Sequence, residues 1–372
     1  MVVFMRIAFL STSMGMGGAD KQILQISEEL QKRGHEIVII SLTELGNMGY
    51  MAIEKGIEVK CFNNNGKKTN FISFIKIFRY LKKWNPDLLT TFMYHANVSG
   101  KVIGKLIGVP VITSIRNEKF GGKLREKIEA GTNFLAKTST TNSRIAAKSL
   151  VKRGIVSSEK MHLIHNGIQI EEYQLDFSTD KSIQKRNNLN IGENTFLWLA
   201  VGRLREQKDY PNLIRALSLI ENSDFRLIIA GKGLLQEKLQ NLVASLGLAD
   251  KVKFLGARND IAELLQIADG FVLSSAWEGL PNVLMEAAAA AKPIVATNVG
   301  GVSELLPVEQ HRFLLPANDS DSLAEKMQEL MGMPEELLKK IGKSNYQFLA
   351  ENFALGKIVD DWEALFRNTF TS

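Results

Sequence analysis

The stretch RIAFLSTSMGMGGADKQILQISEELQKRGHEIVIISL, residues 6–42, places two apolar runs on either side of a segment with helical spacing. The runs 6–12 and 35–42 are rich in Ile, Val and Leu, and the segment Ala19–Arg33 between them ends at Gly34. Because a continuous apolar run is typical of a strand buried on both faces, this order predicts a β-α-β unit with parallel strands.

The same alternation continues along the chain and begins again after a polar interval. Further apolar runs follow at similar spacing up to the irregular residues 167–194, and the alternation then restarts. The further strands that we expect are 57–62, 86–92, 110–115 and 137–142 in the first half, and 196–203, 225–233, 251–256, 270–275, 293–297 and 311–316 in the second.

This pattern predicts an α/β fold with two Rossmann-like, doubly wound domains that face each other across a cleft. We expect an N-terminal domain over residues 1–166, a linker over 167–194 and a C-terminal domain over 195–352. The last segment, about 353–372, has the spacing of an amphipathic helix, and we expect it to return to the first domain. Ligands of such folds bind at the carboxyl ends of the strands, so the residues that follow each strand are the candidates for chemistry.

Composition excludes several classes of protein. The 372 residues are 45% hydrophobic and 23% charged, a balance typical of a globular chain and not of a disordered one. Cys61 is the only cysteine, so neither an internal disulfide nor a Cys-based zinc site can form, which suits a reducing cytoplasm. No uncharged apolar run reaches the roughly 18 residues that a membrane span needs.

The charge is divided unevenly between the two halves. Residues 1–190 contain 28 Lys and Arg against 16 Asp and Glu, a net charge of +12, whereas residues 191–372 have a net charge of −6. A basic half suits an anionic partner, such as a phosphorylated substrate or an anionic lipid headgroup. We do not expect nucleic acid, because no nucleic-acid-binding motif accompanies the charge.

The stretch SSAWEGLPNVLMEAAAAAKP, residues 274–293, contains two carboxylates between a strand and a helix. Glu278 lies in the turn and Glu286 about one helical turn further on, so both face the same mouth. The amides of Asn282 and Val283 at the helix start would point at phosphate oxygens. Glu286 could then accept from two ribose hydroxyls and Glu278 from a sugar. Charges that offset the helix dipole, worth about 0.3–1 kcal/mol, would explain either glutamate alone but not the whole block.

Two cations follow the first strand of the second half. Arg203 and Lys208 lie between that strand and a helix with Pro211 in its first turn. Two fixed cations at that place could neutralise a diphosphate leaving group. Taken alone, the pair would be more typical of solvated surface charges, and the E-x7-E block of residues 278–286 reverses that preference.

The glycine-rich turn at residues 13–20 joins the first strand to the first helix. Gly17 and Gly18 would let the backbone approach an anion at the helix N-terminus. A tight strand-to-helix turn without a ligand is the alternative explanation.

Taken together, these motifs resemble the nucleotide-sugar glycosyltransferases of family 4. EGLPNVLMEA resembles the E-x7-E motif of that family, and the resemblance extends over nearly the whole chain, in the order in which the family has its motifs. The other matching stretches are GMGGADKQ (15–22), HNGI (165–168), GRLREQKDYPNLIRAL (202–217), GKG (231–233), VKFLGARND (252–260) and TNVGGVSEL (297–305).

The resemblance implies the two-domain GT-B fold, a retaining mechanism and roles for individual residues. Glu278 would hold the transferred sugar and Glu286 the ribose, and Arg258 would lie beside the nucleobase. Arg203 and Lys208 would bind the donor diphosphate together with the amides of Asn282 and Val283. Gly17 and Gly18 would close over the phosphates from the other domain. No metal is implied, and the pair Asp319 and Asp321 is expected to cap a helix.

The first domain departs from the common pattern of the family. Many members have a histidine after the strand that here reads VITSI, where this chain has Arg116. His95, at the end of the preceding strand, is the nearest histidine. We expect His95 to lie near the acceptor or the transferred sugar and Arg116 to stabilise a phosphorylated acceptor. A hydrogen-bonded structural histidine is the alternative for His95.

These features predict a metal-independent, retaining glycosyltransferase that uses a nucleotide sugar, UDP-linked above all. We expect a glycan or polyprenyl-linked acceptor and a place in the cytoplasm at the inner face of the cell membrane. The basic, apolar helix 67–85 suits contact with an anionic membrane surface as well as a role in covering the sheet. A nucleotide-sugar epimerase of the same fold and a catalytically silent nucleotide-sugar or glycan-binding protein are the alternatives.

Overall fold

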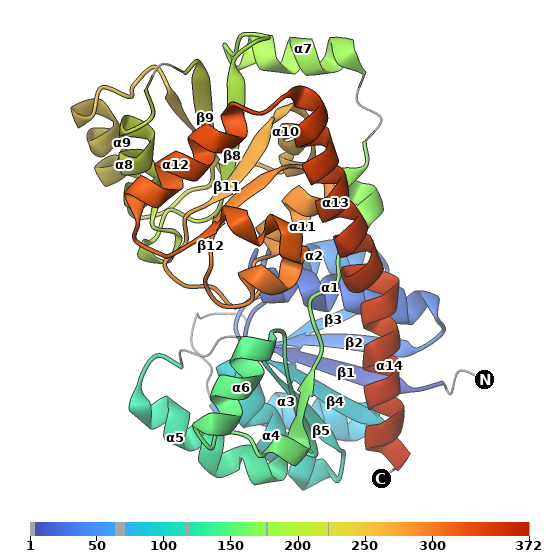
Figure 1. Cartoon of the computed structure of the whole chain (residues 1–372). Helices are drawn as coiled ribbons and strands as arrows, with labels where there is room; N and C mark the ends of the chain where they lie inside the picture. The colour runs from blue at the N-terminus through green and yellow to red at the C-terminus, as the bar shows by residue number, and fades with distance from the viewer. Residues whose placement is uncertain (1–3, 64–70, 117–119, 176–177, 222, 372) are drawn as a thin grey trace. The chain divides into compact units, whose positions relative to one another are not determined.

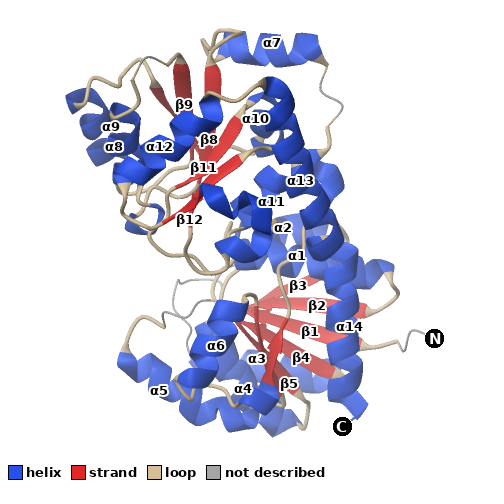
Figure 2. Cartoon of the chain, in the orientation of Figure 1, coloured by secondary structure: helices blue, strands red, loops and turns tan. Residues whose placement is uncertain are grey.

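The computed structural model describes residues 4–63, 71–116, 120–175, 178–221 and 223–371. It divides into two compact units: unit 1 is Met1–Gly167 with Leu355–Ser372, and unit 2 is Ile168–Ala354. Each unit contains a parallel sheet with helices on both faces (Figures 1 and 2). The α/β class and the doubly wound arrangement are therefore confirmed.

In the described residues, the sheet of unit 1 has seven parallel strands in the order β3-β2-β1-β4-β5-β6-β7. The strand order reverses between β1 and β4, which is where ligands bind in open sheets of this kind. All six expected strands are present, and the structure adds the short β7, which pairs with β6. The strands are Arg6–Ser11 (β1), Glu36–Ser41 (β2), Glu58–Cys61 (β3), Leu88–Phe92 (β4), Val111–Ile115 (β5), Thr138–Thr141 (β6) and Met161–Leu163 (β7).

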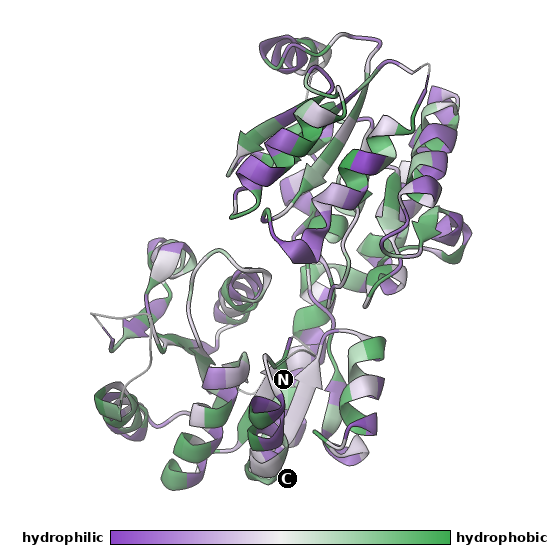
Figure 3. Ribbon diagram, turned by 90° about the vertical axis from the view of Figure 1, so that its left-hand side faces the viewer, coloured by the Kyte–Doolittle hydropathy of each residue, from purple (hydrophilic) through white to green (hydrophobic). Residues whose placement is uncertain are grey.

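Two hydrophobic layers cover the sheet of unit 1. One face packs against α1, α2 and α14, and the other packs against α3 and α4. The helices alternate hydrophobic and hydrophilic residues along their length, as helices with one buried face do (Figure 3). They are Gly18–Lys32 (α1), Gly46–Glu54 (α2), Phe71–Trp84 (α3), Tyr94–Ile107 (α4), Lys123–Thr132 (α5), Arg144–Lys152 (α6) and Leu355–Thr371 (α14).

The helix expected over 67–85 begins at Phe71 in the structure, and residues 67–70 lie outside the described residues. Ile77, Leu81 and Trp84 are buried against the sheet. Phe71 and Ile72 are exposed in the first turn. The role of this helix in covering the sheet is therefore confirmed.

The C-terminal helix α14 belongs to unit 1, as expected. It packs beside α1, and its buried carboxylate Glu363 pairs with two side chains of that region. His35 Nε2 lies 2.9 Å from Glu363 Oε1, and Arg33 Nη1 lies 2.9 Å from Glu363 Oε2. Within the described residues, none of the helices combines the length and the hydrophobicity that crossing a membrane requires.

The described part of unit 2 has a parallel sheet in the order β10-β9-β8-β11-β12-β13. The order reverses between β8 and β11, and all six expected strands are present. The strands are Phe196–Val201 (β8), Phe225–Ala230 (β9), Val252–Gly256 (β10), Gly270–Leu273 (β11), Ile294–Thr297 (β12) and Leu314–Leu315 (β13). The helices are Thr179–Asn188 (α7), Tyr210–Ser218 (α8), Gln236–Ser245 (α9), Ile261–Ile267 (α10), Asn282–Ala289 (α11), Ser320–Met331 (α12) and Glu335–Phe353 (α13).

The range 167–194, expected as a linker, differs in the structure. The two units meet in sequence at Gly167 and Ile168, and the residues beyond that point carry a short 3-10 helix, Ile170–Tyr173 (η3), and α7. Residues 168–194 therefore belong to unit 2 and are not a linker between the units. Their few apolar residues explain this, because Ile170, Tyr173 and Ile191 are buried in the core of unit 2.

Candidate active site

Glu278 lies in the turn between β11 and α11, and its side chain is only 7% exposed. Three side chains donate to its carboxylate. Lys208 Nζ lies 2.6 Å and Ser275 Oγ 2.7 Å from Oε1, and Gln207 Nε2 lies 3.1 Å from Oε2. The ion pair and the two hydrogen bonds hold the carboxylate in one orientation.

Backbone contacts bring Lys208 to this turn. After β8 the chain passes through the 3-10 helix Glu206–Lys208 (η4), and the Ala276 N–H donates to the Gln207 carbonyl at 2.8 Å. Ser274 Oγ donates to the Lys208 carbonyl, also at 2.8 Å. Since β8 and β11 are neighbours in the sheet, these bonds join the residues that follow their carboxyl ends. Lys208 and Glu278 therefore meet, although they are 70 residues apart in the sequence.

Two glycine turns allow the loops of the site to approach each other. Gly300 has a φ of 55°, and a Cβ there would lie 2.1 Å from the Glu278 carbonyl oxygen. Gly231 has a φ of 153°, and a Cβ there would lie 1.9 Å from the Gly202 carbonyl oxygen. A side chain at either position would displace the loop that carries Glu278 or the loop that leads to Arg203. The GKG and NVGG motifs therefore support the site.

The start of α11 adds a second set of polar groups at the same end of the sheet. The helix begins at Asn282, so the amides of Asn282 and Val283 belong to its first turn. Glu286 lies one turn further on and is 8% exposed. These three residues occupy the places in the element order that the sequence predicts for them.

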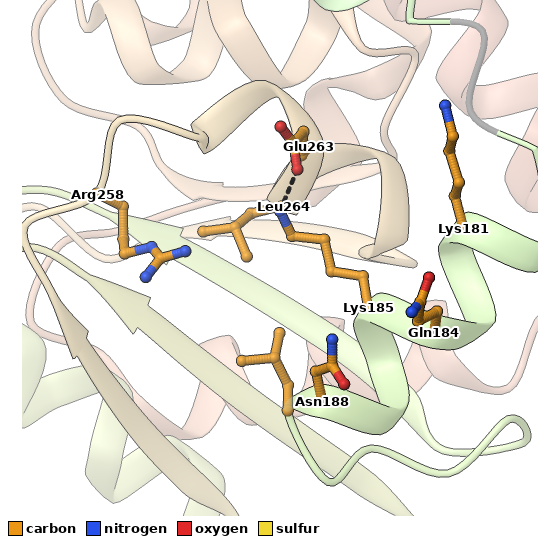
Figure 4. A pocket seen from close by; sticks show the side chains of 8 residues that line it. Lys181, Gln184, Lys185, Asn188, Arg258, Glu263 and Leu264 are labelled. Carbon is orange, nitrogen blue, oxygen red and sulfur yellow. Dashed lines mark hydrogen bonds and ion pairs between the residues drawn. The ribbon is translucent and has the colours of Figure 1, made fainter.

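Arg258 pairs with a neighbour at the end of β10. Its Nε and Nη2 donate to the Asp260 carboxylate at 2.8 and 2.7 Å. The hydrogen bonds from Arg258 and Lys185 hold the pKa of Asp260 well below its usual range. Arg258 lines a groove of about 570 Å³ with Lys181 and Lys185 of α7. Lys185 reaches from α7 to Glu263 on α10 (Figure 4).

Arg203 is exposed two residues after the end of β8. Its position between β8 and η4 is the one that the sequence predicts. The structure therefore places Arg203 and Lys208 on the same connection, with Lys208 turned towards Glu278.

In unit 1 the glycine-rich turn is closed by its own aspartate. Gly17 precedes α1, Gly18 is the first residue of the helix, and the Gly17 N–H donates to Asp20 Oδ2 at 3.0 Å. This bond suits a tight strand-to-helix turn. Phosphate binding by Gly17 and Gly18 stays a prediction.

His95 and Arg116 follow neighbouring strands of unit 1 at the carboxyl edge of the sheet. The His95 ring packs edge-on against Tyr94, with 5.2 Å between the ring centroids. Burial, together with the charge of Arg125, lowers the pKa of His95, so the neutral imidazole is favoured. Arg116 donates to Ser114 Oγ at 2.7 Å from Nε, and its guanidinium carbon lies 5.0 Å from the Phe92 ring centroid.

Within the ranges that the structure describes, no group of three or more His, Cys, Asp or Glu side chains is placed to hold a metal ion. The Asp319 carboxylate caps α12 instead, accepting from the Ser322 N–H at 3.0 Å.

Two family models match the chain one after the other. The model of Glycosyltransferase Family 4 matches residues 16–172, and the model of Glycosyl transferases group 1 matches residues 181–348. The chain belongs to glycosyltransferase family 4.

Individual relatives agree with this assignment. The glycosyltransferase is 28% identical over 311 residues to the UDP-Gal:alpha-D-GlcNAc-diphosphoundecaprenol alpha-1,3-galactosyltransferase of Escherichia coli, covering 79% of this chain and 78% of that protein. It is 27% identical over 221 residues to the N-acetylgalactosamine-N,N'-diacetylbacillosaminyl-diphospho-undecaprenol 4-alpha-N-acetylgalactosaminyltransferase of Campylobacter jejuni, covering 59% of this chain and 57% of that protein.

The fold of the glycosyltransferase is also found in solved structures. Anabaena HepE, in complex with UDP and glucose, superposes with a TM-score of 0.88 at 22% identity, covering 98% of this chain and 100% of that one. WaaG, a glycosyltransferase of lipopolysaccharide biosynthesis, gives a TM-score of 0.76 at 17% identity, covering 97% and 99% of the two chains. The GT-B fold is therefore confirmed.

Two residues of the glycosyltransferase site are not among those that the sequence singles out. Gln207 and Ser275 both donate to Glu278. Gln207 immediately precedes Lys208, and Ser275 ends an expected strand just before the turn. The sequence signal that could have identified Gln207 and Ser275 is that both are polar and lie next to, or within three residues of, a predicted site residue.

Proposed function

We propose that this glycosyltransferase transfers a sugar from a nucleotide-diphosphate sugar to a glycan or lipid-linked acceptor with retention of configuration. A UDP-sugar is the donor in this proposal. The ion pair between Lys208 and Glu278 is the observation that carries the proposal. The name of the E. coli relative, which specifies UDP-Gal and a diphosphoundecaprenol-linked acceptor, and the complex of HepE with UDP and glucose support it.

The donor binds to unit 2 in this proposal. Arg203 and Lys208 contact the diphosphate, together with the amides of Asn282 and Val283. Glu286 accepts from the ribose hydroxyls, and Arg258 lies beside the base. Contact of the Gly17 and Gly18 amides with a phosphate stays a prediction of this proposal.

Glu278 holds the transferred sugar and does not act as a nucleophile. A carboxylate has about four lone-pair sites, and the donors from Lys208, Ser275 and Gln207 use three of them. The remaining site can accept from one sugar hydroxyl. A carboxylate held in this way is poorly suited to forming a glycosyl ester.

The chemical step therefore depends on the departing diphosphate. The bond between the anomeric carbon and the phosphate oxygen breaks, and the negative charge that develops on that oxygen is stabilised by Arg203, Lys208 and the start of α11. The Lys208 ammonium has three N–H donors, so it can contact the diphosphate while it remains paired with Glu278. The acceptor hydroxyl then bonds to the anomeric carbon from the face that the diphosphate leaves, and its proton passes to the departing oxygen.

The acceptor binds to the basic unit 1. Arg116 Nη2 is buried and has no hydrogen-bond partner among the described residues, so it is available to an anionic group of the acceptor. His95, which follows the neighbouring strand β4, acts in this proposal as a neutral hydrogen-bonding group. An acceptor linked to a polyprenyl lipid would bring the enzyme to the cytoplasmic face of the membrane.

A panel of nucleotides tests the proposal. Thermal-shift and calorimetric titrations with UDP, GDP and ADP, each with and without Mg²⁺, should show stabilisation by UDP that does not depend on the metal. Lack of stabilisation by all three would favour the glycan-binding protein. Release of an altered UDP-sugar without any acceptor would favour the epimerase.

A further inference from the structure

Helix α5 has its polar and apolar sides reversed. Its most deeply buried side chain is Glu129, which is fully buried together with Lys101 of α4, with Nζ 2.8 Å from Oε1. Leu124 and Ile128, one turn apart on the helix, are exposed, Leu124 to 72%. A helix that packs on another helix normally turns its leucines inward and its charges outward. The outward leucine and isoleucine therefore call for an explanation other than core packing.

Neighbouring elements extend this apolar surface. The 3-10 helix Asn133–Leu135 (η1) follows α5 directly and exposes 74% of Phe134. The end of α4, which packs against both α5 and η1, exposes 62% of Leu106. We call Leu106, Leu124, Ile128 and Phe134 the α5 patch.

Exposed lysines lie among the apolar residues of the α5 patch. Lys123 and Lys127 occupy the same outward side of α5, because an α-helix turns by 100° per residue and Glu129 faces the opposite way. Lys105 and Lys137 are exposed beside Leu106 and η1. Arg125 and Glu126 are engaged elsewhere: Arg125 packs over Tyr94, and Glu126 pairs with Arg153, the residue that follows α6.

We propose that the α5 patch is the surface through which this enzyme lies on an anionic lipid bilayer. Exposed Leu, Ile and Phe side chains among lysines match the interfacial region of a membrane, where apolar side chains enter the acyl boundary and lysines remain at the phosphates. The basic surplus of residues 1–190 adds a longer-range attraction of the same sign. Both acidic residues of α5 are paired: Glu129 is buried with Lys101, and Glu126 forms an ion pair with Arg153.

The inference deepens the proposed function, because a lipid-linked acceptor would bring the enzyme to a membrane. It also moves the contact from the place that the sequence predicts. The apolar face of α3 is occupied by the sheet, which leaves Phe71 and Ile72 of its first turn as the exposed remainder. The α5 patch has more exposed apolar side chains, and they are spread over three connected elements.

Vesicle sedimentation of the full chain tests the inference. Binding to phosphatidylcholine vesicles with about 30% phosphatidylglycerol should be strong and should weaken as salt is raised. The double variant Leu124→Ser, Phe134→Ser should need about tenfold more lipid for half-maximal binding. Leu234→Ser is the matched control, since Leu234 is 95% exposed in unit 2, and it should bind as the unchanged protein does.

Three results would overturn the inference. The first is unchanged lipid binding by the double variant. The second is a loss of binding in Phe71→Ser, Ile72→Ser instead, which would assign the contact to α3. The third is a dimer of the unchanged protein that dissociates in the double variant, which would make the patch an interface between two copies. Titration of UDP into the unchanged protein and into each variant separates this test from the proposed function. If the unchanged protein did not bind UDP, the proposed function alone would be contradicted.

Discussion

At the scale of single residues, Glu278 has more partners than an ordinary exposed carboxylate. Lys208, Ser275 and Gln207 fix it from three sides. The Ser274 hydroxyl donates to the Lys208 carbonyl and the Ala276 N–H donates to the Gln207 carbonyl, which fixes Lys208 and Gln207 in turn. A site that must hold a sugar while a charge develops nearby needs such preorganised groups. The surroundings of Glu278 therefore support the proposal that its carboxylate holds the transferred sugar.

Replacing Glu278 by Gln separates sugar positioning from nucleotide binding. The amide keeps the size of the side chain but loses the charge that pairs with Lys208. Transfer should slow by about 100-fold, whereas UDP affinity should stay within about threefold, because Glu278 is assigned to the sugar. Steady-state transfer rates and UDP calorimetry measure the two effects. Glu237→Gln, at an exposed carboxylate of α9, is the control, and full activity of Glu278→Gln would contradict the assignment.

The buried ammonium group of Lys292, between α11 and β12, should make the stability of the protein depend on pH. The ammonium donates to the Ala268 carbonyl at 2.9 Å and the Gln266 carbonyl at 3.2 Å, and burial lowers the pKa of Lys292 from 10.5 to about 8. Between these values the unfolded chain binds a proton that the folded chain does not. The free energy of unfolding, relative to that of Lys292→Met, should therefore rise as the pH increases from about 8 to about 10.5. Urea denaturation of both proteins at each pH measures this difference, and a difference independent of pH would contradict the burial of Lys292.

At the scale of elements, α4 lies unusually close to the sheet of unit 1. A Cβ at Gly104 would lie 2.1 Å from Val111 Cγ2 of β5, and one at Gly100 would lie 2.3 Å from Thr91 Cγ2 of β4. The two glycines therefore set the distance between α4, which carries His95 in its first turn, and the strands β4 and β5, the second of which precedes Arg116.

Gly104→Ala should lower the free energy of unfolding by about 1–3 kcal/mol, because the added methyl must push the helix away from β5. Gly131→Ala in α5 is the matched control: a Cβ there meets nothing within 4 Å, so the substitution should be neutral or should stabilise the helix by about 0.5–1 kcal/mol. Urea denaturation measures both, and equal effects at the two positions would contradict the packing described.

The elements themselves could largely be predicted from the sequence. Parallel strands covered on both faces appear as continuous apolar runs, so twelve of the described strands were expected, whereas β7 is only three residues long. The role of residues 168–194 differed, because a few scattered apolar residues suffice to attach a polar segment to a core. The reversed helix α5 escaped prediction because its buried ion pair joins residues from two helices.

Within the site, the residue types could be predicted but not all of their contacts. The E-x7-E spacing and the element order indicate where Glu278, Glu286 and Lys208 lie. The hydrogen bond from Gln207 to Glu278 spans 71 residues, and the bond from Arg116 Nη1 to Asn166 Oδ1 spans 50. Such pairs depend on the register of neighbouring strands, which local patterns do not determine.

At the scale of the whole molecule, the chain leaves unit 1 at Gly167 and returns to it at Leu355. Gln22 of α1 fixes the backbone of Gly167. Its side-chain amide accepts from the Gly167 N–H at 2.8 Å and donates to the Gly167 carbonyl at 2.7 Å. Where the chain returns, α14 packs beside α1 through Glu363. Unit 1 is therefore a discontinuous domain that the last helix completes.

Glu363→Gln should weaken unit 1. The substitution removes the charge that His35 and Arg33 share, and Glu363 is 7% exposed, so the free energy of unfolding should fall by about 1–3 kcal/mol. Asp360→Asn also removes a partner of Arg33, but this side chain is 68% exposed and should matter by less than about 1 kcal/mol. Chemical denaturation compares the two, and a larger loss in Asp360→Asn would contradict the role of α14 in unit 1.

The most direct test of the whole account is calorimetric titration of UDP into the unchanged protein and into the variants Lys208→Ala and Glu286→Ala. Lys238→Ala is the control, because Lys238 is exposed on α9. We expect UDP to bind the unchanged protein and Lys238→Ala alike, and to bind each of the other two at least about tenfold more weakly with an unaltered melting temperature. Unchanged UDP affinity in Lys208→Ala and Glu286→Ala would contradict the donor site at the carboxyl edge of the unit 2 sheet.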